Sequence, residues 1–166
     1  MLYFCWLAQH LLYAFSVFLS WYSERGNKLK ILLYSPHVDG VGAKLLGIIE
    51  GLGINEKIEI YRNIDSLNKR LRKPTYNIDI FILIAPNKEQ LTEVLLIKEE
   101  LRDTKIILIL PDSESDTISR GHELYPRFVS YIDSDFKEVG AVLEKMIKNK
   151  HSEKWKNLEK GKCLKL

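Results

Sequence analysis

The chain has 166 residues, of which 46% are hydrophobic and 28% are charged, and its formal net charge is +3. This length allows one domain with a short appendage, and the composition argues against global disorder. The mild charge and the lack of a dense basic motif argue against nucleic-acid binding. The two cysteines, Cys5 and Cys163, are far apart and form no metal-ligand pattern, which indicates a reducing compartment.

The N-terminal segment, residues 1–22, contains no Asp, Glu, Lys or Arg. A helix of this length spans roughly 30 Å, so the segment predicts a possible membrane anchor. Arg25 and Lys28 follow it and would keep the next domain on the cytoplasmic side. A second interpretation is that translation starts at Leu29, where the first strand begins, and that residues 1–28 are a mis-set start. The sequence leaves both open.

Five segments predict β-strands. Three of them are apolar without alternation, which is typical of strands covered by helices on both faces of a parallel sheet. The segment that runs from Asp79 into Ile84 is the most central of these. The segment from Lys57 to Tyr61 alternates polar and apolar residues and suits a sheet edge. The five strands are expected at residues 29–34, 57–61, 79–84, 105–110 and 128–132.

A helix is expected after each strand, because apolar residues recur there at helical spacing. Asp39, Asn63 and Asn87 are the expected N-caps of the first three helices. The third helix is expected to run on through Leu101, and the fourth to cover 116–124. The last begins after Asp135, and a basic tail is expected at 151–166.

Strands and helices in strict alternation predict an α/β fold, a three-layer αβα sandwich around a five-stranded parallel sheet. The second strand is amphipathic, which suits an edge, and the third strand is the most apolar, which suits the centre. The expected strand order is therefore 2-1-3-4-5, the flavodoxin-like arrangement. The domain is expected to occupy residues 29–150.

From about Leu29 to Lys148 this pattern resembles the receiver (CheY-like) domain of two-component response regulators. An aspartate followed by five apolar residues in Asp79–Ile84 and the closing segment FVSYIDSDFKEVGAVLEKMI are the closest parallels. The resemblance implies a place in signalling. The family binds Mg²⁺ with an acidic pair after its first strand and is phosphorylated on an aspartate that ends the third.

The residues of that chemistry are missing here. The acidic pair falls at Ser35 and Pro36, and the phosphoacceptor at Ile84 or Ala85. The phosphate-binding hydroxyl falls at Leu110 or Pro111, and the lysine near Ser134. The resemblance therefore implies a pseudo-receiver that is not phosphorylated, is not an enzyme and needs no cofactor or metal. Its expected partner is a protein or a second copy of the chain. The residues expected on its interaction face are Ile118, Leu124 and Tyr131.

Two alternative functions stay open. Parallel sheets bind ligands beyond the carboxyl ends of their strands, so a small-molecule or nucleotide pocket is possible there. The candidate residues are Ser35, His37, Asp39, Asn87, Asp112 and Ser113. A zinc-dependent deacetylase is the other alternative, because residues 36–39 resemble the P-H-x-D start of PIG-L-like de-N-acetylases. However, Gly40 replaces the second acid and no H-x-x-H follows, although zinc hydrolases need three protein ligands.

Overall fold

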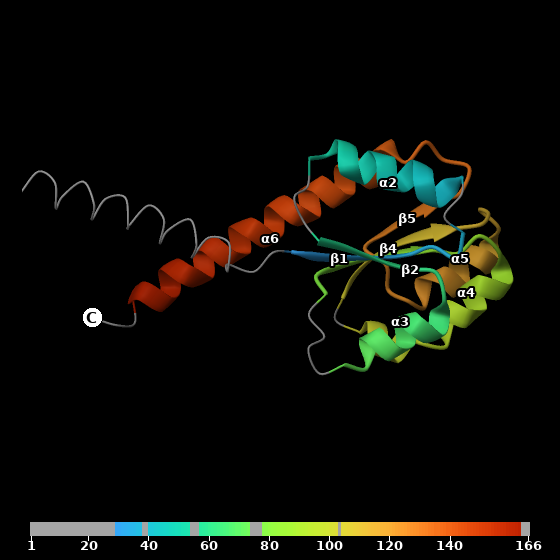
Figure 1. Ribbon diagram of the computed structural model, residues 1–166, viewed down its shortest axis with the longest axis horizontal. Helices are drawn as coiled ribbons and strands as arrows, with labels where there is room; N and C mark the ends of the chain where they lie inside the picture. Colours follow the sequence, from blue (N-terminus) through green and yellow to red (C-terminus); the bar gives the residue numbers. More distant parts are fainter. Residues whose placement is uncertain (1–28, 38–39, 54–56, 74–77, 103, 164–166) are drawn as a thin grey trace, which may run out of the picture.

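The computed structural model describes residues 29–37, 40–53, 57–73, 78–102 and 104–163. Five parallel strands form one sheet in the order β2-β1-β3-β4-β5, as Figure 1 shows. The strands are β1 (Lys30–Tyr34), β2 (Lys57–Tyr61), β3 (Ile80–Ile84), β4 (Lys105–Leu110) and β5 (Phe128–Tyr131). The predicted strands and their order are confirmed.

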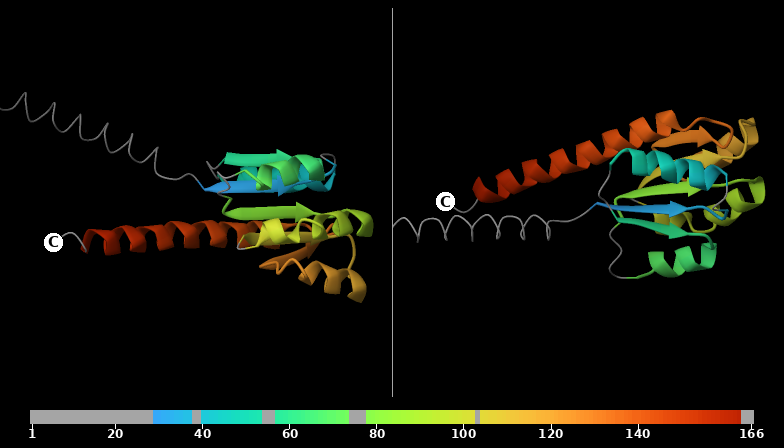
Figure 2. Two further views of the ribbon diagram at one scale, coloured as in Figure 1. Left: turned by 90° about the horizontal axis from the view of Figure 1, so that it is seen from below. Right: turned by 45° about the horizontal axis from the view of Figure 1, so that its top comes forward.

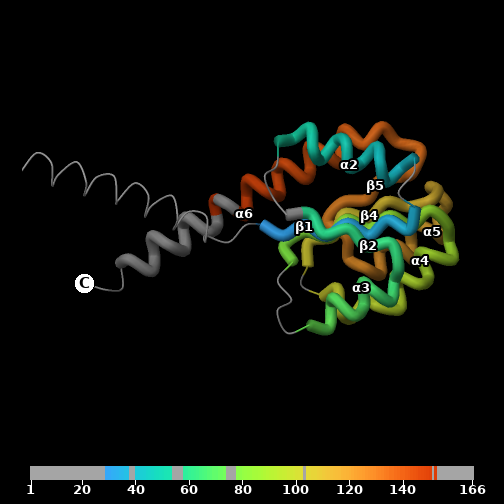
Figure 3. The backbone as a smooth tube through the Cα atoms, viewed as in Figure 1, coloured from blue at the N-terminus to red at the C-terminus, as the bar shows by residue number. Residues whose placement is uncertain are grey.

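The helices lie on both faces of this sheet, which makes three layers. One face is covered by α2 (Val41–Gly51) and α6 (Lys137–Cys163). The other face is covered by α3 (Ile64–Leu71), α4 (Lys88–Leu95), the 3₁₀ helix η1 (Lys98–Leu101) and α5 (Ser115–His122). Helices join consecutive strands, so that all five strands run in the same direction, and the path of the chain can be followed in Figures 2 and 3.

The core is two apolar clusters, one on each side of the sheet, and β3 supplies both. Phe81 and Leu83 belong to the cluster under α3, α4 and α5, whereas Ile80, Ile82 and Ile84 belong to the cluster under α2 and α6. All five residues of β3 are buried. This explains why its sequence does not alternate, because a side chain on either face meets a helix rather than water.

Two of the three predicted N-caps are confirmed. The backbone N–H of Asp65 donates to the side-chain oxygen of Asn63 at 2.7 Å, and that of Gln90 donates to Asn87 at 2.8 Å. The prediction for α2 was wrong, because Gly40 occupies its N-cap position with φ +67° and no side chain caps the helix. Asp39 itself lies outside the described residues.

The long helix expected through Leu101 is interrupted. α4 ends at Leu95 and η1 begins at Lys98, with Ile97 between them at φ −106° and ψ 17°. The break buries both Ile97 and Leu101 while Leu96 stays 80% exposed. A continuous helix would place the charged side chain of Lys98 on the buried face. The change to 3₁₀ geometry avoids the free-energy cost of burying that charge.

The last helix is tied to the start of the sheet. Lys150 of α6 forms an ion pair with Asp79 at 3.1 Å, and the same carboxylate accepts the backbone N–H of Lys30 at 3.1 Å. α6 continues to Cys163, into the segment expected to be a basic tail. The predicted anchor at 1–28 lies outside the described residues. Within the described part of the chain, no helix combines the length and hydrophobicity that crossing a bilayer requires.

Candidate functional site

The expected site lies at the edge of the sheet where the parallel strands end. The central strand brings no acid to this edge. Its last residue, Ile84, is 2% exposed, and the following Ala85 is 0% exposed. The backbone N–H of Ala85 donates to the carbonyl of Ile109 at 2.9 Å, which continues the sheet one residue further. The position at which the resemblance puts a phosphoacceptor is therefore part of the apolar core.

The turn after β1 uses its own polar groups. Ser35 is 2% exposed, and its hydroxyl donates to the carbonyl of His37 at 2.5 Å. The first turn of α2 packs against this hydroxyl, because a Cβ added at Gly42 would lie 2.6 Å from Ser35 Oγ and 2.8 Å from the His37 carbonyl oxygen. Ser35 thus holds the turn in place, while the side chain of His37 is exposed.

The contact predicts a clear effect of Gly42→Ala. The added methyl group collides with a backbone carbonyl that has little freedom to move, so we expect a loss of about 1–3 kcal/mol in the free energy of unfolding. Urea denaturation measures it. Gly47→Ala is the matched control, because nothing lies within 4 Å of a Cβ at Gly47. Equal stability of the two variants would contradict the packing described here.

The polar residues after β3 and β4 serve the helices that follow. Asn87 caps α4, and Asp112 accepts the backbone N–H of Glu114 at 3.0 Å. The Thr117 side chain and the hydrogen bond from the Glu114 amide lower the pKa of Asp112. Lys88, the first residue of α4, forms an ion pair with Glu114, which precedes α5, and Ser113 is exposed. Capping therefore accounts for much of the polarity that suggested a ligand pocket.

A lysine reaches this edge from an unexpected element. Lys44 of α2 donates to the carbonyl of Ser134 at 2.9 Å, and its ammonium lies 5.1 Å from the centroid of the Phe136 ring. The pKa of Asp135 is lowered, mainly by Lys137 and to a smaller extent by Lys44. Ser134 and Lys44 are 90 residues apart. No local pattern joins them, which is why sequence reasoning missed the contact.

The histidines of the zinc alternative do not meet. His37 follows the carboxyl end of β1, whereas His122 ends α5 near the start of β5, at the opposite end of the sheet. Among the described residues, no group of three or more His, Cys, Asp or Glu side chains is placed to hold a metal ion. Asp39 lies outside those residues.

Tyr34, the last residue of β1, predicts an alkaline effect on stability. Burial, helped by the charge of Glu93, raises the pKa of its hydroxyl from 10.0 to about 12. A raised pKa in the folded state gives stability that is complete below pH 10 and is lost as the pH rises through the folded value. We therefore expect Tyr34→Phe to lose less stability than the unmodified protein between pH 10 and 12, by up to about 2 kcal/mol. Identical pH profiles in urea denaturation would contradict this.

The three residues expected on an interaction face are placed differently. Ile118 of α5 and Tyr131 of β5 are partly buried and pack against the core under α5. Leu124 is 5% exposed and belongs to that core, so it offers a partner little surface. The large side chain that does face solvent next to it is Tyr125, which is 87% exposed.

Comparisons with known proteins agree with this arrangement at the level of fold. No protein-family model and no curated protein sequence matches the chain. Similar solved structures include the signal receiver domain of an HD domain-containing protein from Pseudomonas fluorescens Pf-5, with TM-score 0.58 and 16% identity over 76% of this chain and 99% of the other. A response regulator from Thermotoga maritima gives TM-score 0.56 and 16% identity over 74% and 99%.

A third similar structure is a putative pilus assembly-related protein from Burkholderia pseudomallei, with TM-score 0.56 and 15% identity over 71% of this chain and 88% of the other. The sheet order and helix layers define a doubly wound α/β domain with flavodoxin-like topology. Within that class the chain has the receiver-like fold.

Proposed function

We propose that the receiver-like domain, residues 29–150, is a signalling module that works without phosphorylation, by binding a protein partner or a second copy of itself. The observation that carries the proposal is the apolar end of β3, where Ile84 and Ala85 are buried. Phosphoryl transfer needs a nucleophile and a cation that neutralises developing charge. A buried isoleucine and alanine supply neither.

The proposal is supported by the loops around that position. The Ser35 hydroxyl donates a hydrogen bond to the His37 carbonyl, and the carbonyl of Ser134 accepts one from the ammonium of Lys44. These groups are engaged within the fold rather than directed to a bound anion. These contacts support a module that is not an enzyme and whose role is carried by its surfaces. We place it in the cytoplasm, with residues 1–22 as its possible membrane tether.

Incubation of the full chain with acetyl phosphate and Mg²⁺ tests the central claim. Intact-protein mass spectrometry should show an unchanged mass, whereas an authentic receiver domain treated in parallel should gain one phosphoryl group. A hydroxylamine-labile adduct on this chain would overturn the proposal, because it would show that another carboxylate takes the place of the missing acceptor.

The binding role has a separate test on the surface formed by α5 and β5. Sedimentation velocity and pull-down with the full chain measure self-association and partner capture. We expect Ile118→Arg or Tyr131→Arg to weaken the association. Ile60→Arg is the matched control, because Ile60 is 45% exposed on β2, the opposite edge strand. If all three variants associate like the unmodified protein, this surface is not the interface.

A further inference from the structure

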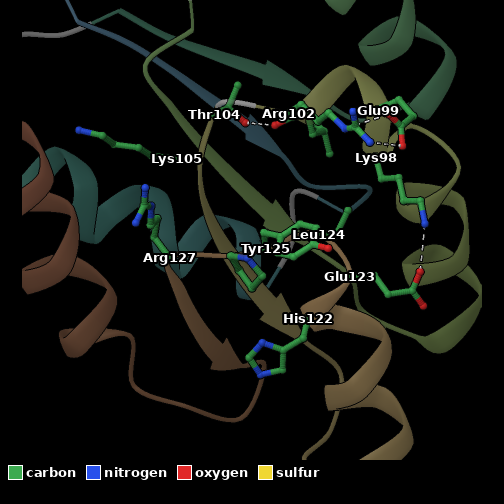
Figure 4. A pocket seen from close by; sticks show the side chains of 12 residues that line it. Lys98, Glu99, Arg102, Thr104, Lys105, His122, Glu123, Leu124, Tyr125 and Arg127 are labelled. Atoms are coloured by element: carbon green, nitrogen blue, oxygen red, sulfur yellow. Dashed lines mark hydrogen bonds and ion pairs between the residues drawn. The ribbon is translucent and has the colours of Figure 1, made fainter.

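The opposite end of the sheet, where β4 and β5 begin, carries a hollow of about 950 Å³. η1, the first residues of β4 and the turn from α5 to β5 form its walls (Figure 4). Its lining is mainly polar, and its volume is in the range of ligand-binding clefts. Of the three residues expected on the interaction face, only Leu124 lines the hollow, so an inference about it does not depend on the proposed function.

Charge in the hollow is only partly balanced. Lys98 pairs with Glu123 at 3.2 Å, and Arg102 pairs with Glu99 at 2.9 Å. Lys105 and Arg127 have no ion pair with any residue that the structure describes, and both extend away from the two pairs in Figure 4. The backbone N–H of Arg127 donates to the carbonyl of Ile106 at 2.7 Å, which fixes Arg127 beside the start of β4.

An exposed aromatic residue lines the same hollow as these cations. Tyr125 is 87% exposed and has φ +51°, a left-handed conformation that residues other than glycine rarely adopt. The residues before it hold this conformation, because the N–H of Tyr125 donates to the carbonyl of His122 at 3.0 Å and Leu124 is anchored in the core. The fold therefore keeps Tyr125 in this conformation with its side chain exposed.

The side chains of Lys105, Arg127 and Tyr125 indicate which kind of ligand the hollow would bind. Arg and Lys side chains bind carboxylates, and a fixed tyrosine ring contributes contact area at low entropic cost. The chain as a whole has a net charge of only +3, which argues against a continuous phosphate backbone as the ligand. We propose that this hollow binds an acidic segment of a partner protein, with its carboxylates on Lys105 and Arg127 and an adjacent apolar side chain against Tyr125.

The probe is the peptide Glu-Asp-Phe-Glu-Asp-amide with fluorescein on its N-terminal amine, titrated with the full chain and followed by fluorescence anisotropy. We expect saturable binding that weakens as salt rises. The double variant Lys105→Gln/Arg127→Gln should weaken binding about tenfold, in line with the loss of two charge-assisted contacts. The control Lys69→Gln/Lys145→Gln makes the same change in net charge at two exposed lysines outside the hollow and should leave the affinity unchanged.

Tyr125→Gly separates docking from folding. Glycine adopts positive φ without strain, so the thermal midpoint should not fall, while the peptide affinity should fall about threefold because the aromatic contact is lost. Equal affinities for Tyr125→Gly and the unmodified protein would overturn the proposal. So would equal weakening by the two double variants, absence of peptide binding, or tighter binding of single-stranded DNA of matched charge.

Discussion

Replacing Phe81 by alanine should remove about 3–5 kcal/mol from the free energy of unfolding. Phe81 is 0% exposed, lies in the central strand, and is paired across the sheet with Leu32 and Ile106. Its ring fills the cluster under α3, α4 and α5. Because strands and helices are packed around it on all sides, the cavity left by the ring has little means of collapse.

The measurement is urea denaturation followed by far-UV circular dichroism. A domain of this size is stable by only about 5–15 kcal/mol, so the midpoint should move strongly to lower urea. Leu96→Ala is the control, because Leu96 is 80% exposed and its loss should change stability by less than about 0.5 kcal/mol. Similar midpoints for the two variants would mean that β3 is not the centre of the core.

The position of Phe81 shows why the fold was predictable from sequence. An apolar run such as Ile80–Ile84 has no solvated face, and only a sheet covered on both sides accommodates it. The alternating segment Lys57–Tyr61 identified the edge strand for the complementary reason, since β2 pairs with β1 alone among the strands that the structure describes. Hydrophobic pattern and short connections therefore determined the strand order almost completely.

The site was less predictable, because its geometry depends on contacts between distant residues. The predicted topology correctly placed Ser35, Asn87 and Asp112 at the edge of the sheet where the strands end. It did not show that each already has a partner in its own turn or cap. The contact of Lys44 with Ser134 and the left-handed backbone of Tyr125 have no signature in local spacing. These features arise from how loops pack, which periodicity does not encode.

Introducing an aspartate at Ile84 tests directly whether the end of β3 is a closed part of the apolar core. Ile84 is 2% exposed and belongs to the cluster with Phe136 and Val139 under α2 and α6. In such surroundings desolvation raises a carboxyl pKa by about 3–5 units, and at pH 7 this costs about 4 kcal/mol, because only the pH units above the unfolded value near 4 contribute. We therefore expect Ile84→Asp to be largely unfolded at pH 7.

The pH dependence of the stability of Ile84→Asp separates the effect of the buried charge from the effect of the changed side-chain shape. Because the folded-state pKa of the new carboxyl is raised, its cost disappears as the pH falls toward the unfolded value near 4 and grows as the pH rises. Ile84→Asn, which has a similar shape but does not ionise, should lack this dependence, and Ile84→Val should lose only about 0.5–1.5 kcal/mol. An Ile84→Asp protein that is stable at pH 7 and takes a phosphoryl group from acetyl phosphate would contradict the account. Such a result would mean that the new carboxylate reaches water and a cation. The end of β3 would then be an open pocket that lacks one acidic residue, and not a closed part of the core.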